Sequence, residues 1–453
     1  MRSPPEAGRH IPLSRLLLLA FSATAGVTVE FYDFFLYGYA AASAFPATFF
    51  PNLPPTEALV FSYLAFGAGF PARLVGAFVF GHFGDRIGRK SAFIINISLV
   101  GLTTCLTGLL PGYASLGIMA PILLVALRIL QGIGLGGEFG GASALLSEFG
   151  ATRRSRAFWT SLANLGIAFG GILASAVLLL FSDNFAAGGW RVAMLLSAVI
   201  VIPALLARYR LADSPLFERV KEREQVARLP SVAVFRTHAS RIVLLALVFA
   251  FQQMDGYISG TYIISFMNFA GIPLATTAML LLVGRIGDAA GIIISGPTAN
   301  RLKRRGVATI AMALTTALSL PFVLAILGRR IAIIGVLQFF ITFLGVGVLH
   351  GLAPILTSES FPTKFRYSGA GIAFNLSAIF GGMVAPSLLA GLIGADVGRR
   401  WYYVPVVYAI YCAVGMLALA FISETRDVDL ERLDGASSTT GGARAKEQPV
   451  GMD

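Results

Sequence analysis

Two acidic residues stand close together inside the first long apolar stretch of the chain. Glu30 and Asp33 are three residues apart and Tyr37 follows one turn later, so a helix would place all three on one face. Two carboxylates this close cannot both ionise cheaply, and one of them could hold a proton. Asp33 and Glu30 are therefore proton-coupling candidates. The alternative is that they pair structurally with Arg73 or Arg128.

Buried arginines offer the complementary chemistry. Arg128, with Gln131 close by, and Arg73 fall inside apolar stretches. A charged side chain at the centre of a membrane helix costs about 2.5–3.5 kcal/mol, so it needs a partner, water or a function. A guanidinium presents paired N–H donors that match a carboxylate. All three residues are substrate-binding candidates, although Arg128 could equally neutralise Asp33 or Glu138.

More polar residues interrupt apolar stretches later in the chain. Arg285 and Asp288 are three residues apart, which favours an internal salt bridge over a substrate contact. Asn164 and Asn375 occupy equivalent places in two stretches, where each could face a substrate or join two helices. The other substrate-binding candidates are Tyr37, Gln252, Asp255 and Tyr257, with Tyr262, Trp159 and Gln338 as weaker ones.

Histidine and cysteine give no catalytic or metal-binding pattern. Cys105 and Cys412 lie in different apolar stretches without disulfide or metal-ligand spacing. His82 and His350 are isolated, so we expect structural histidines, although either could titrate. We therefore expect no enzyme activity, no cofactor and no metal.

The elements that must position these residues are membrane-spanning helices. Of the 453 residues, 56% are hydrophobic and 13% are charged, about half the charged share of a soluble protein. Stretches of roughly 20 apolar residues are long enough to cross a bilayer as helices. Gly132, Gly136 and Gly140 recur every four residues, which would let a neighbouring helix approach closely. We expect an all-α protein with twelve spans, at about 16–45, 57–82, 91–111, 116–146, 157–182, 190–209, 241–268, 274–299, 307–327, 331–357, 368–394 and 401–423.

The net charge of +12 follows the predicted topology. Basic residues cluster before the first span and after every second span, which predicts that both termini are cytoplasmic. The charge is therefore topological, and we expect no nucleic-acid partner. The predicted divisions are a cytoplasmic N-terminus 1–15, a six-helix half 16–209, a cytoplasmic linker 210–240, a second half 241–423 and a polar, disordered tail 424–453.

The chain also repeats itself. The segment Gly81–Lys90 returns, with changes, as Gly296–Arg305, where Asn300 stands in place of Asp85. A second set of residues recurs 211 positions later: Glu148, Asn164, Gly170 and Gly171 correspond to Glu359, Asn375, Gly381 and Gly382. Two matched membrane halves are typical of transporters that rock about a central site.

The segment Gly81–Lys90 resembles the G-x-x-x-D-R-x-G-R-K loop of the major facilitator superfamily. The segments 30–34, 128–138, 213–217 and 359–369 resemble its metabolite:proton symporter branch, which includes shikimate, 2-oxoglutarate, citrate and proline/betaine permeases. The resemblance covers about residues 20 to 427. It implies a conformational-switch motif that comprises Gly81, Gly84, Asp85, Arg86, Gly88, Arg89, Lys90, Glu148, Arg301, Glu359 and Arg366.

These patterns favour a proton-coupled transporter of the bacterial inner membrane. We expect a monomer that imports a small organic metabolite through alternating access of its two halves. The substrate class that the residues favour is a carboxylate. Two alternatives stay open: a proton-driven efflux antiporter of the same superfamily, and a membrane sensor that transports nothing.

Overall fold

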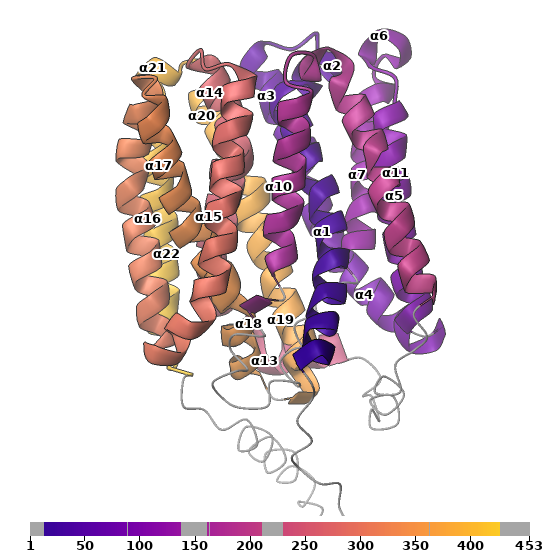
Figure 1. The fold of residues 1–453 in the computed structure, drawn as a ribbon, viewed down its shortest axis with the longest axis vertical. Helices are drawn as coiled ribbons and strands as arrows, with labels where there is room; N and C mark the ends of the chain where they lie inside the picture. The colour runs from indigo at the N-terminus through magenta and orange to yellow at the C-terminus, as the bar shows by residue number, and fades with distance from the viewer. Residues whose placement is uncertain are drawn as a thin grey trace, which may run out of the picture.

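A computed structural model describes residues 13–87, 89–136, 161–162, 164–210, 230–361 and 363–425. Every regular element in this part of the chain is a helix (Figure 1). The first half contains α1 (Leu13–Ser43), α2 (Phe45–Phe49), α3 (Pro55–Gly67), α4 (Gly69–Ile87), α5 (Arg89–Leu109), α6 (Tyr113–Leu116), α7 (Met119–Leu135), α10 (Leu165–Leu180), η1 (Phe185–Gly189) and α11 (Trp190–Arg210).

Three spans of the second half change helical pitch on the way across, because each contains a π-helical segment. The first is α13 (Pro230–Tyr257), η2 (Ile258–Tyr262) and α14 (Ile263–Phe269); the others are α17 (Ile331–Ile341), η3 (Thr342–Val348) and α18 (Leu349–Ser360), and α19 (Thr363–Ala378), η4 (Ile379–Val384) and α20 (Ala385–Ile393). The remaining helices are α15 (Leu274–Arg301), α16 (Arg304–Leu327), α21 (Val397–Arg400) and α22 (Tyr403–Ala420).

The predicted spans are confirmed. Among the described residues, eight helical stretches are long and apolar enough to cross a membrane, and Ile94–Leu109, Met119–Leu135 and Leu165–Leu180 are shorter apolar helices. With α1, each of the twelve predicted spans has a helical counterpart among the described residues. The helix α13 begins at Pro230, inside the predicted linker, where a proline in the first turn forfeits no helical hydrogen bond. The predicted tail from 426 onward lies outside the described residues.

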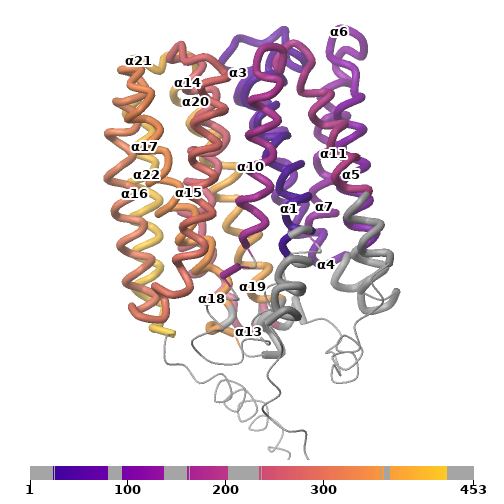
Figure 2. The backbone as a smooth tube through the Cα atoms, viewed as in Figure 1, coloured from indigo at the N-terminus to yellow at the C-terminus, as the bar shows by residue number. Residues whose placement is uncertain are grey.

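The helices form two groups that stand side by side, the first half in indigo and purple and the second in orange and yellow (Figure 2). The α1 helix begins and α22 ends at the same end of the bundle, at the bottom of Figure 1, which we call the lower end. The halves contact each other through α10 and α15, α4 and α19, and α3 and α20. These three helix pairs bring the two halves into contact along the bundle.

Glycines allow equivalent helix pairs to approach closely in both halves. A Cβ atom at Gly136 of α7 would collide with the backbone of α4 around Arg73 and Gly76. A Cβ atom at Gly347 of η3 would collide with Asp288 O and lie 2.9 Å from the Cα of Gly291 on α15. Gly136 and Gly347 are 211 residues apart, so the spacing of the sequence repeat reappears in the packing. The predicted close approach at Gly132 and Gly136 is confirmed.

Candidate functional site

A hydrogen-bonded relay joins the carboxylate of α1 to the arginine of α7. The Thr104 hydroxyl on α5 donates to Asp33 Oδ2 at 3.0 Å, and Gln131 Nε2 donates to Thr104 Oγ1 at 2.8 Å. Arg128 Nη1 in turn donates to Gln131 Oε1 at 2.6 Å. Asp33 is fully buried and Arg128 is 1% exposed. A negative and a positive charge thus balance each other through two neutral side chains rather than by direct contact.

Aromatic rings enclose the Arg128 guanidinium. Its central carbon lies 4.4 Å from the ring centroid of Phe34, 4.3 Å from that of Tyr37 and 4.7 Å from that of Phe66. Its Nε donates to Phe66 O at 3.0 Å, which fixes the plane of the group. Such cation–π contacts stabilise a desolvated cation by about 2 kcal/mol or more each. Within the described residues, Nη2 has no hydrogen-bond partner, so this donor is available to a ligand.

The second acidic residue of α1 has a different partner. Glu30 Oε1 lies 3.8 Å from Arg73 Nη2 on α4, a pairing that the sequence left open. The Arg73 guanidinium carbon is 4.5 Å from the Phe34 centroid, so Phe34 is shared by both arginines. Arg73 Nε and Nη2 have no hydrogen-bond partner in the described part of the chain.

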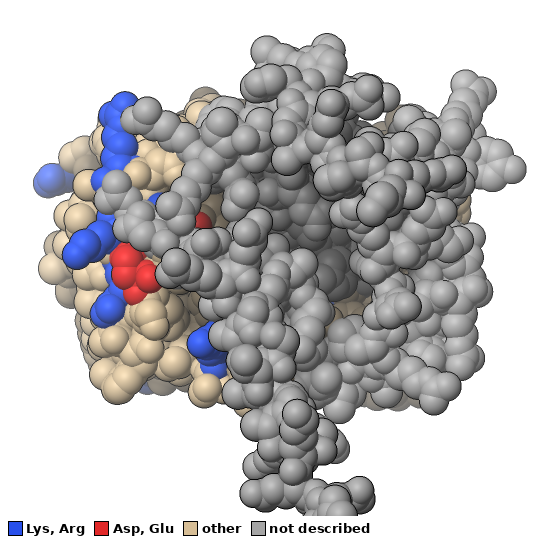
Figure 3. Space-filling model, turned by 90° about the horizontal axis from the view of Figure 1, so that it is seen from below, with Lys and Arg blue, Asp and Glu red and all other residues tan. Residues whose placement is uncertain are grey.

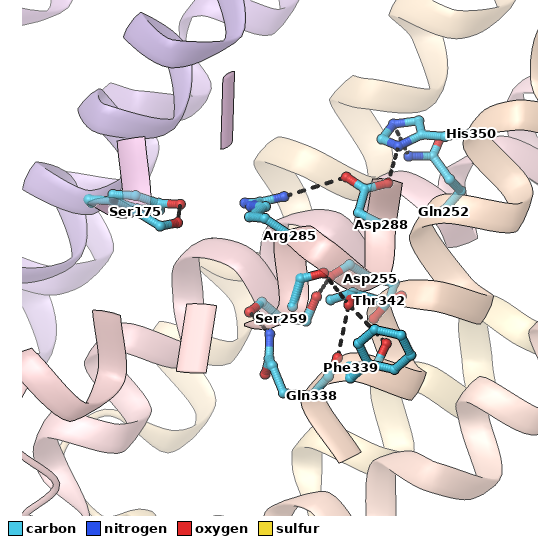
Figure 4. Close-up of polar contacts among 12 residues, drawn as sticks. Ser175, Gln252, Asp255, Ser259, Arg285, Asp288, Gln338, Phe339, Thr342 and His350 are labelled. Atoms are coloured by element: carbon cyan, nitrogen blue, oxygen red, sulfur yellow. Dashed lines mark hydrogen bonds and ion pairs between the residues drawn. The ribbon is translucent and has the colours of Figure 1, made fainter. Parts of the chain in front are cut away.

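A second buried polar network lies in the other half (Figure 4). Arg285 Nη1 and Asp288 Oδ2 on α15 are 4.0 Å apart, as their spacing predicts. Asp288 Oδ1 lies 3.3 Å from His350 Nδ1, and His350 Nε2 lies 2.7 Å from Gln252 Nε2. Asp255 accepts a 2.5 Å hydrogen bond from the Tyr408 hydroxyl. All of these side chains are at most 5% exposed.

The π-helical segments adjoin this network. In η3, Gly345 approaches Asp255 so closely that a Cβ atom there would collide with Oδ2. In the same segment, Thr342 donates to Gly284 O on α15 at 2.6 Å. A π-helical turn inside an α-helix often marks a functional site, because it shifts the register of the side chains beyond it.

Tyr257 connects the two networks across the interface. Its ring centroid lies 5.6 Å from that of Phe34 and 5.1 Å from that of Phe70, both in the first half. The guanidinium of Arg285 lies only 3.7 Å from the centroid of Phe35 on α1. Aromatic and cation–π contacts therefore join the two halves at the interface.

Direct hydrogen bonds also cross between the halves. At the upper end, Ser265 on α14 donates to Ala42 O at 2.8 Å and shares a 2.9 Å hydrogen bond with the Tyr63 hydroxyl on α3. Asn164 at the start of α10 donates to the backbone carbonyl of His350 at 2.8 Å. Asn164 thus forms a contact between the halves. Of the two roles that the sequence allowed, facing a substrate or joining two helices, the hydrogen bond corresponds to the second.

At the lower end, the described basic side chains lie beside an acidic patch (Figure 3). Arg304 donates to Glu359 through Nη2 at 2.9 Å and Nε at 3.2 Å. Glu359 also accepts from Thr425 at 2.6 Å, and Glu424 accepts from the backbone N–H of Arg304 at 3.0 Å. Arg301, the residue named in the predicted switch motif, is exposed. The observed partner of Glu359 is therefore Arg304, the first residue of α16, whereas Arg301 is the last residue of α15.

The other predicted residues fall into two groups. Asn375 is buried at 3% exposure on α19, and Gln338 donates to Ser259 O at 2.9 Å. Gly88, Glu138, Glu148 and Trp159 lie outside the described residues, as do the side chains of His82, Asp85, Arg86, Arg89, Lys90 and Arg366 and the surroundings of Gly81 and Gly84.

Sequence reasoning missed Phe34, Thr104, Tyr63, Ser265 and Arg304. Phenylalanine, threonine, tyrosine and serine are common in membrane helices, so the presence of these residue types did not mark a functional site. The charge of Arg304 was visible in the sequence, but several neighbouring basic residues were equally plausible partners for Glu359.

No metal or disulfide chemistry emerges from this part of the chain. Among the described residues no group of three or more His, Cys, Asp or Glu side chains could hold a metal ion. Cys105 and Cys412 are free thiols. The arrangement instead places buried carboxyl groups beside buried arginines in each half.

Comparison with known proteins identifies the family. The Major Facilitator Superfamily profile matches residues 34–386. The inner membrane metabolite transport protein YhjE of Escherichia coli is 34% identical over 433 residues, which is 93% of this chain and 97% of that protein. The shikimate transporter of Escherichia coli is 31% identical, covering 93% of this chain and 98% of its own length. The glycine betaine/proline/ectoine/pipecolic acid transporter OusA of Dickeya dadantii is 30% identical, covering 95% and 88%.

The fold has a counterpart among solved structures. The crystal structure of D-xylose-proton symporter superposes with a TM-score of 0.69 at 18% sequence identity, covering 90% of this chain and 98% of that one. At this identity the likeness concerns the fold alone.

Proposed function

The chain belongs to the Major Facilitator Superfamily, and we propose that it is a proton-coupled importer of a small carboxylate-bearing metabolite. Its relatives are metabolite transporters, so the chain is a multi-pass membrane transporter of the metabolite permease branch and not an enzyme. The finer statements concern the coupling ion, the substrate class, the direction of transport and the inner membrane as its location. They rest on the site described above.

The observation that carries the substrate class is the set of unpaired guanidinium donors at the interface. Arg128 Nη2 in the first half and Arg285 Nη2 in the second are buried, and neither has a hydrogen-bond partner among the described residues. An unsatisfied buried donor of a charged group costs several kcal/mol. A substrate carboxylate would accept from such a donor and would add the negative charge that buried arginines favour.

Proton coupling follows from the position of Asp33. Its Oδ2 atom is linked to Arg128 through Thr104 and Gln131, so the charge on Asp33 and the orientation of Arg128 depend on each other. A proton on Asp33 would leave the Arg128 charge without its balancing anion. The arginine would then hold a substrate carboxylate more strongly, which couples proton and substrate binding.

The substrate class can be tested by thermal shift. Purified protein would be screened against organic acids, amino acids and betaines, because a ligand that binds the folded state raises its apparent stability. We expect a carboxylate-bearing compound to raise the Tm, and Arg128→Lys to reduce the effect, since lysine lacks the paired donors. Stabilisation by sugars or amines alone would contradict the proposed class.

Proton coupling and direction need a flux assay. In proteoliposomes with an imposed pH gradient, acid outside should drive accumulation of the identified substrate. Asp33→Asn should abolish that accumulation, whereas Glu57→Gln, an exposed carboxyl at the upper end, should not. Accumulation by the Asp33→Asn protein with an unchanged pH dependence would refute the coupling role. Uptake only with the gradient reversed would indicate an efflux antiporter instead.

A further inference from the structure

His350 stands at the centre of a buried chain of polar contacts, of which the proposed substrate and proton sites use only Arg285. Its Nδ1 atom lies 3.3 Å from Asp288 Oδ1 on α15, and its Nε2 atom lies 2.7 Å from Gln252 Nε2 on α13. His350, Asp288 and Gln252 are 5%, 0% and 1% exposed. Figure 4 shows Arg285, Asp288, His350 and Gln252 in sequence along this chain.

The contacts of the ring fit one neutral tautomer. An amide nitrogen only donates, so with Gln252 Nε2 facing the ring, His350 Nε2 is the acceptor. The ring hydrogen then lies on Nδ1 and is donated to Asp288 Oδ1. This arrangement matches the neutral Nδ1–H tautomer, with a carboxyl group on one side and a neutral amide on the other.

The same residues can also hold the charged form of the ring. An imidazolium would carry a hydrogen on Nε2 and would need an acceptor there. Gln252 Oε1 has no hydrogen-bond partner in the described part of the chain, and a half-turn of the amide would bring it to Nε2. Asp288 Oδ2 likewise has no hydrogen-bond partner within that part. Both charge states can thus be satisfied without moving a helix.

The charged and titratable groups around His350 are few. From α13, Asp255 faces the network, and its own partner is the Tyr408 hydroxyl of α22. From α15, Arg285 lies 4.0 Å from Asp288 and its charge, with that of Asp288, acts on Asp255. The helix α10 and the segment η3 carry no charged residue, and the charged residues of α16 are its first two. On α18, the nearest charge is Glu359 at the lower end.

His350 is also in contact with the other half. Its backbone carbonyl accepts the 2.8 Å hydrogen bond from Asn164 of α10. Arg285, at the opposite end of the chain of contacts, lies over Phe35 of α1. A change in the charge of this network therefore acts on both sides of the interface that must open and close during transport.

We propose that His350 and Asp288 form a second proton-binding site, located in the second half and coupled to the interface through Asn164 and Arg285. A proton from water adds to His350 Nε2, Asp288 remains a carboxylate, and the net charge of the network rises by one. The proton leaves from the same nitrogen when the opposite end opens. This inference rests on the proposed function, because it assigns a second site to the same proton-coupled cycle.

The protonation state can be measured without transport. The full chain has four histidines, so replacing His10, His82 and His238 by glutamine leaves His350 as the only one. Nitrogen-15 NMR of labelled histidine in nanodiscs distinguishes the two neutral tautomers from the imidazolium. We expect two forms of the ring, the neutral Nδ1–H tautomer and the imidazolium, in spectra recorded without and with added acid. A ring that keeps one form in both, or a neutral ring in the Nε2–H form, would overturn the proposal.

Transport gives a second, independent readout. We expect His350→Gln to lower the ratio of gradient-driven accumulation to substrate exchange at zero gradient by roughly 5- to 150-fold, the usual range of a coupling free energy. The control is His238→Gln, which removes a histidine outside the network and should leave the ratio unchanged. Equal ratios in the two variants would refute the role of His350. If the unmodified protein shows no gradient-driven uptake, the proposed function fails, while NMR still decides the proton site.

Discussion

Replacing Ser265 with alanine should open the upper end of the transporter. The Ser265 hydroxyl has one hydrogen, which it donates to Ala42 O at 2.8 Å. The Tyr63 hydroxyl must therefore donate to Ser265 Oγ, at 2.9 Å. Tyr63 and Ser265 are 0% and 2% exposed, and both bonds run between the two halves. The alanine variant loses two inter-half hydrogen bonds in a single step.

The size of the effect follows from those two bonds. A neutral hydrogen bond contributes about 0.5–1.5 kcal/mol net, so Ser265→Ala should weaken the closed upper end by about 1–3 kcal/mol. That free energy changes the ratio of open to closed molecules by roughly 5- to 150-fold. Tyr63→Phe removes only one bond and should change the ratio by roughly 2- to 13-fold. In the double variant, the two effects should be less than additive, because the residues share one bond.

Distance measurement by pulsed electron paramagnetic resonance between two spin labels can detect this change in the ratio of open to closed molecules. Thr56 at the start of α3 and Gly394 at the end of α20 lie against each other across the upper end. Spin labels at the neighbouring exposed positions Glu57 and Ala395 would report its opening. The labels would be attached after Cys105 and Cys412 are replaced by serine.

A matched control is available on α3, the helix that carries Tyr63. Ser62 Oγ donates to Ala41 O of α1 at 2.7 Å, so this hydrogen bond stays within one half. Ser62→Ala removes a buried hydrogen bond of the same kind and should leave the distance distribution unchanged. If Ser265→Ala gave no larger population of the long distance than Ser62→Ala, these hydrogen bonds would not hold the upper end closed.

Three further changes test other parts of the structure. Asn164→Ala removes an inter-half hydrogen bond of 2.8 Å and should weaken the contact between α10 and α18 by about 0.5–1.5 kcal/mol, measured by spin-label distances across that contact. Gly136→Ala should destabilise the fold by about 1–3 kcal/mol and lower the Tm, because the added Cβ would collide with the α4 backbone, whereas Gly371→Ala, which meets open space, should not. Arg304→Gln should lower the Tm by removing the pair with Glu359, and Arg304→Lys should recover only part of the loss, since lysine cannot donate in parallel to both carboxylate oxygens.

The fold was predictable because its signals are long and periodic. A run of some 20 apolar residues has few alternatives to a membrane helix, and the 211-residue repeat fixed the relation of the halves. Pairings that depend on three-dimensional register were not predictable. Glu30 could meet either Arg73 or Arg128 until the helices were placed. The π-helical turns of η2, η3 and η4 have no characteristic amino-acid composition that would have revealed them in the sequence. They nevertheless change the register of the side chains that follow them in the second half.

The distribution of charge pairs explains how two bodies with buried charges can separate repeatedly. Each described ion pair or charge relay at the centre stays within one half: Glu30 with Arg73, Asp33 with Arg128, and Arg285 with Asp288. The described contacts across the interface named above are neutral hydrogen bonds, aromatic contacts and the cation–π contact of Arg285 with Phe35, and none of them is an ion pair.

This separation of roles has an energetic reason. Breaking a buried ion pair costs about 3–5 kcal/mol, whereas breaking a neutral hydrogen bond costs about 1 kcal/mol. An interface without ion pairs can therefore open on one side while it closes on the other, with only a small difference in free energy. An ion pair that bridged the halves would favour a single conformation. Under the proposed function, substrate and proton are the charged groups that reach the interface only transiently, and their binding can decide which conformation is stable.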